Sequence, residues 1–193
     1  SFRKLSKLQK KLESLKSAAI SSSDSRIYAF EWAPLIIFKE NQRQIVPMRY
    51  HLRPAGALET FDRRYPGCYN ARFDNLDGFW KNQFGKRHGV IVLNAFYENV
   101  KRHDFEQREL RPGEVEENII LEFRPEAMQE MLVPCIWDEW GKDGELKSFA
   151  IITDDPPKEI EETGHNRCPV FLKEENLDAW INPVDKSKEE LFN

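Results

Sequence analysis

The sequence predicts an α+β protein: a single compact β-rich domain with an antiparallel or barrel-like sheet and a few peripheral helices. Apolar runs of strand length recur along most of its 193 residues. Helical patterns are fewer and do not alternate regularly with the strands, which argues against a doubly wound parallel sheet. A chain of this length can bury one hydrophobic core, so we expect one domain over residues 1–193.

The N-terminal segment, residues 1–20, has the pattern of a basic amphipathic helix. Its apolar residues recur at steps of three and four over residues 2–17: Phe2, Leu5, Leu8, Leu12 and Leu15. Lysine and arginine side chains cover the opposite face, which is either a solvated surface or a patch that faces DNA. A polar link at residues 21–25 follows this helix.

Strands are predicted where β-branched and aromatic residues form short apolar runs. These runs are residues 34–38, 45–50, 90–97, 119–123, 132–137, 149–153 and 170–172. Helices are predicted over residues 76–84, near 127–131 and over 174–181. The charged segment 101–117 is expected to cross the surface between two strands, and residues 184–193 are expected to form a frayed tail.

The composition excludes several classes of protein. No apolar run is long enough to span a membrane, and the basic N-terminus lacks the apolar block of a signal peptide, so we expect no membrane partner. The odd number of widely spaced cysteines, Cys68, Cys135 and Cys168, argues against a disulfide framework and paired zinc hooks. A reducing cytoplasm is the predicted location.

The net charge of −4 argues against binding a polyanion through bulk charge. A nucleic-acid partner would therefore need a local basic cleft inside an acidic protein. The chain contains no Walker loop, no Gly-x-Ser-x-Gly and no His-Glu-x-x-His motif. We therefore expect no metal and no nucleotide cofactor.

Three short segments hold the side chains best suited to chemistry. Asn70 and Arg72 offer an amide and a planar guanidinium that suits phosphate, although such a pair in a loop is more often structural. Glu98 follows the most apolar run: in a partly dry site it would act as a general acid or base, and at an exposed strand end it would not. His165 and Arg167 put a titratable ring beside a second guanidinium, although a lone loop histidine is also more often structural.

Two further features have simpler explanations. Cys168 is a possible nucleophile, but Pro169 and a predicted strand follow it, so we interpret it as a small buried residue. Asp154 and Asp155 suggest a metal site, but two prolines follow them and no histidine pair has the spacing of metal ligands.

Taken in order, these segments resemble the motifs of the SOS-response-associated peptidase (SRAP) family. Each motif is weak alone, but five in the same order are specific, and the likeness runs from Tyr28 to Pro183. The matching segments are residues 46–54 for Met-Arg-Trp-Gly-Leu-x-Pro, 69–72 for Asn-Ala-Arg with Asp74 as the usual acidic residue, 96–98 for Phe-Tyr-Glu, 151–153 for a strand ending in Thr, and 165–169 for His-x-Arg-x-Pro.

The resemblance implies a β-rich fold with a positively charged cleft for single-stranded DNA that contains abasic sites. It implies a monomer without a cofactor, located in the cytoplasm at the nucleoid. Family members remove their initiator methionine, which exposes a cysteine. The amine and thiol of this cysteine then condense with the aldehyde of a ring-opened abasic site to form a thiazolidine crosslink, and abasic-site lyase activity belongs to the same expectation.

The family's roles carry over to the matching positions. Glu98 is expected to move protons, Asn70 to orient the N-terminal residue, and His165 to act as an acid or base on the opened sugar. The expected DNA-binding residues are Arg72, Thr153 and Arg167.

Two departures from the family pattern affect these expectations. Asn99 follows Glu98 where many relatives have tryptophan, so a stacking role there is lost or relocated. The chain begins Ser1-Phe2-Arg3, without the N-terminal cysteine. An internal cysteine cannot replace it, because the ring needs an amine and a thiol on one residue. We therefore expect the crosslinking cysteine upstream of Ser1.

Two other functions stay open at this point. One is a non-enzymatic domain of the same kind that binds single-stranded DNA. The other is a small hydrolase that uses Glu98 and His165 on a substrate other than DNA. A Met-Cys start upstream of Ser1 would favour the enzyme, and salt-insensitive or absent DNA affinity would favour the hydrolase.

Overall fold

The computed structural model describes residues 25–126, 129–184, 186 and 188–192. The basic amphipathic helix predicted within residues 1–20 lies outside these described residues. None of the described helices is long and apolar enough to cross a membrane.

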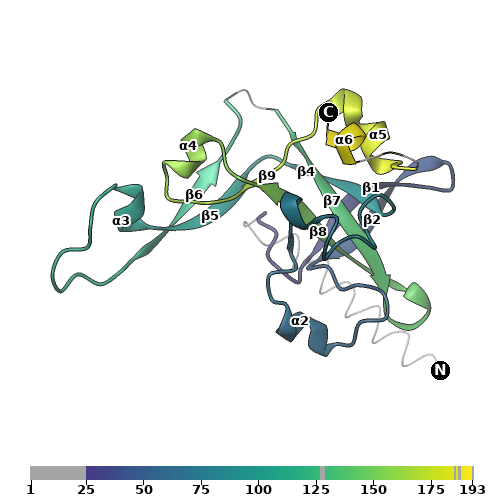
Figure 1. The fold of residues 1–193 in the computed structure, drawn as a ribbon, viewed down its shortest axis with the longest axis horizontal. Helices are drawn as coiled ribbons and strands as arrows, with labels where there is room; N and C mark the ends of the chain where they lie inside the picture. The colour runs from purple at the N-terminus through teal and green to yellow at the C-terminus, as the bar shows by residue number, and fades with distance from the viewer. Residues whose placement is uncertain (1–24, 127–128, 185, 187, 193) are drawn as a thin grey trace, which may run out of the picture.

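Most strands belong to one curved sheet that closes on itself (Figure 1). Its strands are β1 (Trp32–Lys39), β2 (Gln42–Tyr50), β3 (Asn70–Arg72), β4 (His88–Leu93), β7 (Met131–Trp140), β8 (Leu146–Asp154) and β9 (Cys168–Pro169). The barrel follows the order β2-β1-β4-β7-β8, and β2 pairs with β8 to complete the circle. This confirms the predicted α+β domain with a barrel-like sheet.

Strand β8 is paired along both edges. Its first half closes the barrel through a parallel pairing with β2, in which Tyr50 lies opposite Phe149. Its second half pairs in parallel with the short strand β3, so that Asn70 lies opposite Ile151. Antiparallel pairings with β7 and β9 occupy the other edge. The strand that closes the barrel therefore also places the residues on β3 and β9.

The barrel wall separates two hydrophobic clusters. The cluster inside the barrel draws on every barrel strand and includes the fully buried Leu35 and Phe149. The cluster outside it includes Trp180, which is 1% exposed. Val90 and Ile91 are neighbours on β4 and belong to opposite clusters. Both faces of β4, β7 and β8 are largely buried, so these strands read as nearly continuous apolar runs in the sequence, whereas β1 and β2 alternate between buried and more exposed residues.

A two-stranded hairpin projects from the barrel, at the left of Figure 1. It consists of β5 (Phe96–Lys101), β6 (Asn118–Phe123) and the connection between them, which begins with α3 (Arg102–Phe105). We call residues 96–123 the hairpin arm. The exposed connection confirms the surface excursion predicted there, but the single strand predicted over residues 90–97 is wrong. The chain leaves the barrel after Leu93 and starts a second sheet at Phe96.

The other helices are short and lie outside the barrel. They are α2 (Thr60–Arg64), α4 (Lys158–Glu161), α5 (Leu177–Ile181), α6 (Lys188–Phe192) and the 3-10 turns η1 (Phe73–Asn75), η2 (Lys142–Gly144) and η3 (Glu174–Asn176). Together η3 and α5 confirm the helix predicted over residues 174–181. In α6, Leu191 is buried in the outer cluster. This part of residues 184–193 is therefore packed, which differs from the predicted frayed tail.

Residues 76–84 form consecutive turns, so the helix predicted there is wrong. The Phe79 N–H donates to Asn75 Oδ1 at 3.2 Å. A bond of this kind competes with helical hydrogen bonding. Gly78 allows it, because a Cβ at that position would lie 2.6 Å from Asn75 Oδ1.

Two further short elements differ from their predictions. A helix was predicted near residues 127–131, but Met131 begins strand β7. Residues 127–128 lie outside the described chain. A strand was predicted at residues 170–172, but the strand observed in this region, β9, lies just before them. The Val170 N–H donates to the Ile152 carbonyl oxygen at 3.0 Å, and Leu172 forms an isolated antiparallel bridge with Leu132, in which its N–H lies 2.8 Å from the Leu132 carbonyl oxygen.

His88 is buried between the barrel and α5 as a neutral ring. Its Nε2 accepts the Gly85 N–H at 2.8 Å, so Nδ1 carries the hydrogen and donates to the Trp180 carbonyl oxygen at 3.0 Å. The His88 and Trp180 rings stack with centroids 4.0 Å apart. Burial lowers the pKa of His88 to about 4. Protonation would add a buried charge and remove the acceptor for Gly85.

We expect the free energy of unfolding to decrease as the pH falls from 7 to 5. An unfolded His88 takes up a proton near its ordinary pKa, whereas the folded one does so only near pH 4, so acid favours the unfolded chain. This one residue should contribute about 2 kcal/mol of the decrease. Urea unfolding of wild type and His88→Gln at both pH values measures it. Equal pH dependence in the two proteins would contradict the assignment.

Candidate active site

A cavity of about 680 Å³ lies between the barrel and the base of the hairpin arm. Residues 25–28, 91–99 and 165–167 form much of its lining. Tyr50, Tyr69, Phe149 and Ile151 add a mostly apolar wall from the barrel strands and the residue before β3. The cavity therefore joins chain segments that are far apart in the sequence.

Glu98 and His165 form an acid–base pair in this cavity. Glu98 lies in the middle of β5, and its Oε2 is 2.9 Å from His165 Nε2. His165 Nδ1 lies 2.7 Å from the Arg167 carbonyl oxygen, which can only accept, and 3.3 Å from the Arg167 backbone nitrogen, which can only donate. The carbonyl contact is much the shorter of the two, so we assign a hydrogen to Nδ1. One further proton is then shared between Nε2 and the carboxyl group. The pair can exist as an ion pair or as a neutral acid and imidazole, which is the property needed to move a proton.

The surroundings of Glu98 favour its protonated form. Burial raises its pKa, and the nearby His165 opposes part of that rise. Tyr50 and Cys168 respond to the same environment: burial raises both pKa values, and the negative charge of Glu98 adds to the rise. The carboxyl group is therefore in the partly dry site that the general acid–base interpretation requires, and not at an exposed strand end.

Asn70 contributes an unused acceptor to the cavity. It lies on β3 beside Ile151, and its buried Oδ1 has no hydrogen-bond partner among the described residues. Arg167 also lines the cavity, and within the same part of the chain its buried Nε has no partner either. Buried polar atoms rarely stay unpaired, so these two atoms suit a bound ligand that supplies a donor and an acceptor.

Thr153 and Arg72 stand apart from this group, because neither belongs to the cavity lining. The Thr153 hydroxyl is buried near the end of β8, and no residue in the described part of the chain hydrogen-bonds to it. The Arg72 guanidinium donates two hydrogen bonds to Asp74, at 3.0 and 2.8 Å, and lies 3.9 Å from Asp155. A phosphate would have to compete with these carboxylates for Arg72.

Two cavity arginines were not anticipated from the sequence. Arg26 lies over the rings of Tyr28 and Tyr97, 5.6 and 5.4 Å from their centroids, and Arg124 follows β6. The Tyr97 hydroxyl donates to Glu122 at 2.6 Å, which fixes the ring beneath Arg26. Isolated arginines carry no periodic or motif signal, so only the folded chain reveals them.

A buried cluster around Asp62 supports the loop that delivers Asn70. Arg49 and Arg53 both donate to the Asp62 carboxylate, and their guanidinium groups lie 4.5 and 4.1 Å from the centroid of the Trp140 ring. Burial alone would raise the pKa of Asp62, but the hydrogen bonds from Arg53 and Arg49 lower it to about 2. The loop between β2 and β3 is thereby fixed to the barrel.

The cysteines do not provide a nucleophile. Cys68, Cys135 and Cys168 are all free and buried, which confirms the structural interpretation of Cys168. Burial raises the pKa of Cys68 and of Cys168 to about 11. Their thiols are therefore protonated near neutral pH. Across the described residues, no group of three or more His, Cys, Asp or Glu side chains is arranged to hold a metal ion.

The fold and the cavity together define the class of protein. It is a small β-barrel protein whose cavity contains a partly buried carboxyl–imidazole pair and several arginines. The family model described as SOS response associated peptidase (SRAP) matches residues 3–193, and the chain belongs to this family. None of the curated proteins matches the chain.

Three of the solved structures with a similar fold come from two bacteria. A protein from Bacteroides thetaiotaomicron is 22% identical with a TM-score of 0.64, over 84% of this chain and 67% of its own. A protein from Bordetella bronchiseptica is 17% identical with a TM-score of 0.66, over 85% of this chain and 79% of its own. A phage-related protein from the same organism is 17% identical with a TM-score of 0.60, over 86% and 74%. At these identities the likeness shows a shared fold.

We expect the carboxyl group of Glu98 to titrate above the ordinary range for glutamate, with a further rise in His165→Gln. The variant loses the positive charge that holds the pKa of Glu98 down. The measurement is a pH titration of the side-chain carboxyl carbon by NMR. Arg43→Gln, which removes a positive charge outside the cavity lining, is the control and should leave the midpoint in place. A midpoint unaffected by His165→Gln would show that the two groups do not share a proton.

Proposed function

We propose that this SRAP protein detects abasic sites in single-stranded DNA by covalent capture. The observation that carries the proposal is the Glu98–His165 pair at 2.9 Å, in a cavity that also holds the unpaired Asn70 Oδ1. The nucleophile is a cysteine upstream of Ser1, directly after the initiator methionine. Such a protein acts in the cytoplasm at the nucleoid, as a monomer.

The first step is hydrolysis of the peptide bond between that methionine and the cysteine. Glu98 takes a proton from water, whose oxygen attacks the methionine carbonyl carbon. The C–N bond then breaks, and the proton passes from Glu98 to the departing cysteine amine. Asn70 Oδ1 accepts a hydrogen bond from this amine and holds it in place. The products are free methionine and a protein that begins with cysteine.

The second step joins this cysteine to the DNA. An α-amine with a pKa of about 7.7–8.0 is partly neutral at pH 7 and attacks the aldehyde carbon of the ring-opened sugar. Loss of water gives an imine, the cysteine sulfur adds to the imine carbon, and the thiol proton moves to nitrogen. Ring closure is fast because both groups belong to one residue. His165 supplies or removes the proton at the sugar oxygen as the ring opens, and the imine is also the intermediate from which strand cleavage by a lyase would proceed.

Arginines around the cavity support a DNA ligand despite the negative net charge. Arg26 and Arg167 line the cavity and would contact the flanking phosphates, and Arg124 would do so only if a phosphate replaces Glu122 as its partner. Arg72 binds a phosphate only if that phosphate replaces Asp74 as its partner. Thr153 contributes its free hydroxyl from the strand that carries Ile151.

The proposal predicts a covalent product with damaged single-stranded DNA. The protein is produced with Met-Cys ahead of Ser1 and incubated with a single-stranded oligonucleotide that contains one abasic site. A retarded band on a denaturing gel is the expected result, absent with intact DNA and with serine in place of the upstream cysteine. Failure to crosslink despite a verified N-terminal cysteine would refute covalent capture. DNA binding without a crosslink would then favour the non-enzymatic binder, and no DNA affinity would favour the hydrolase.

Glu98→Gln is expected to retain the initiator methionine. The amide cannot accept the proton of the attacking water, so hydrolysis should slow by roughly 10²–10⁴-fold. Mass spectrometry of protein made in a translation system without methionine aminopeptidase measures the retained fraction. Glu116→Gln, on the hairpin arm and outside the cavity lining, is the control and should be processed normally. Complete removal of methionine in Glu98→Gln would contradict its role.

Arg167→Ala is expected to weaken binding to intact single-stranded DNA and to reduce its salt dependence. Loss of one phosphate contact lowers the slope of log K against log salt by about 0.7 for single strands. Arg43→Ala removes an arginine that pairs with Asp178 and does not line the cavity, so its slope should equal that of wild type. Equal slopes for all three proteins would exclude Arg167 from the phosphate contacts.

A further inference from the structure

The loop that carries His165 contacts the hairpin arm at Gly164 as well as through the Glu98–His165 pair. Gly164, the residue before His165, has a φ of +86°. A Cβ at Gly164 would lie 2.9 Å from the Cβ of Asp104, so the two residues touch backbone to side chain. On its other side the loop is held by α4, whose Ile160 is buried, and the Gly164 N–H donates to the Glu161 carbonyl oxygen at 2.9 Å.

Asp104 is connected to Glu98 by one short segment of the chain. Strand β5 carries Glu98 and ends at Lys101, and α3 follows without a break and carries Asp104. One continuous segment therefore holds the acid of the pair and also the surface on which the loop of His165 rests.

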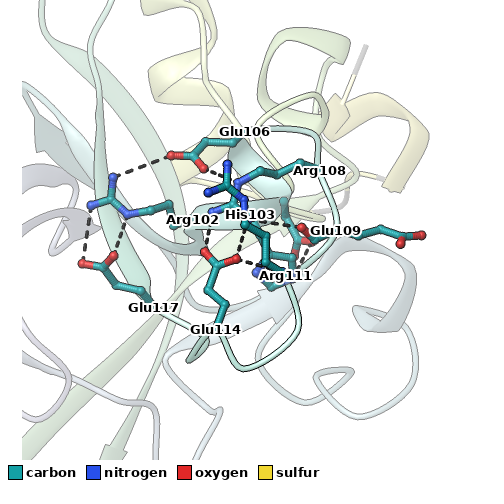
Figure 2. Close-up of polar contacts among 9 residues, drawn as sticks. Arg102, His103, Glu106, Arg108, Glu109, Arg111, Glu114 and Glu117 are labelled. Carbon is teal, nitrogen blue, oxygen red and sulfur yellow. Dashed lines mark hydrogen bonds and ion pairs between the residues drawn. The ribbon is translucent and has the colours of Figure 1, made fainter.

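Ionic and backbone contacts fix α3 within the arm (Figure 2). The Arg102 N–H donates to the Glu117 carbonyl oxygen at 2.8 Å, and its guanidinium binds the Glu117 carboxylate at 2.7 Å. Arg108 reaches Glu106 at 2.6 Å and Glu114 at 2.6 and 2.8 Å. Such exposed pairs are weak singly, but together they hold a helix of four residues that has little buried surface of its own.

We propose that Gly164 and Asp104 are positioning residues whose contact sets the separation of Glu98 and His165. The absence of a side chain at Gly164 lets the loop come close enough for Nε2 to reach the carboxylate. A larger residue would push the loop away from α3 and lengthen the 2.9 Å contact. The effect on catalysis rests on the proposed function, whereas the effect on the pair does not.

The test compares alanine at two glycines with similar backbone conformation. Gly164→Ala is expected to raise the titration midpoint of the Glu98 carboxyl group, measured by NMR, because His165 moves away. In protein with Met-Cys ahead of Ser1 it should also slow methionine removal and crosslinking by roughly 10–100-fold. Gly113→Ala is the matched control: Gly113 has a φ of +82° on the same arm and nothing within 4 Å of a built Cβ. It should leave the midpoint and both rates unchanged.

A second variant separates the contact from the backbone conformation. Gly164→Ala combined with Asp104→Gly removes the overlapping Cβ, so the midpoint should return toward that of wild type. The inference is overturned if Gly164→Ala titrates like Gly113→Ala, or if the double variant does not recover. If the wild-type protein forms no crosslink, the proposed function fails, and the titration still decides whether the contact positions the pair.

Discussion

The pairing of β8 along both of its edges is the constraint on which the rest of the structure depends. Its parallel pairing with β2 closes the barrel, and the same edge continues into β3, which delivers Asn70. Its other edge pairs with β7 and then with β9, which follows the loop of His165. A single strand thus couples closure of the core to the placement of two cavity segments. A shift of one residue in its register would turn Phe149 out of the core and misplace both segments.

Much of the barrel was predictable because β4, β7 and β8 are largely buried on both faces and so appear as nearly unbroken apolar runs. The pairing of β2 with β8 was not, because residues 50 and 149 meet only through the path of the whole chain. The helix expected at residues 76–84 failed for a local reason. Asn75 binds the backbone at Phe79, and Gly78 leaves room for its side chain, so turns replace helical hydrogen bonding.

The three residues predicted to share a site do line one cavity, although 28 or more positions separate them in the chain. The short motifs made this shared site predictable, because each motif lies within a single strand or loop. The charged groups around the cavity were harder to predict from the sequence. Arg26 and Arg124 lie outside any motif, and the pairing of Arg72 with Asp74 depends on side-chain direction. Their roles as DNA contacts remain predictions.

The late position of His165 has a consequence for the order of events during synthesis. Domains fold as their chain leaves the ribosome, N-terminal parts first. The acid, Glu98, emerges well before its partner, and β9, which anchors the loop after His165, follows all the barrel strands in sequence. The pair therefore cannot assemble on a nascent chain until nearly the whole barrel is available. If this site trims its own N-terminus, the cut is made after translation of the domain, and a trimmed terminus marks a molecule that has completed folding.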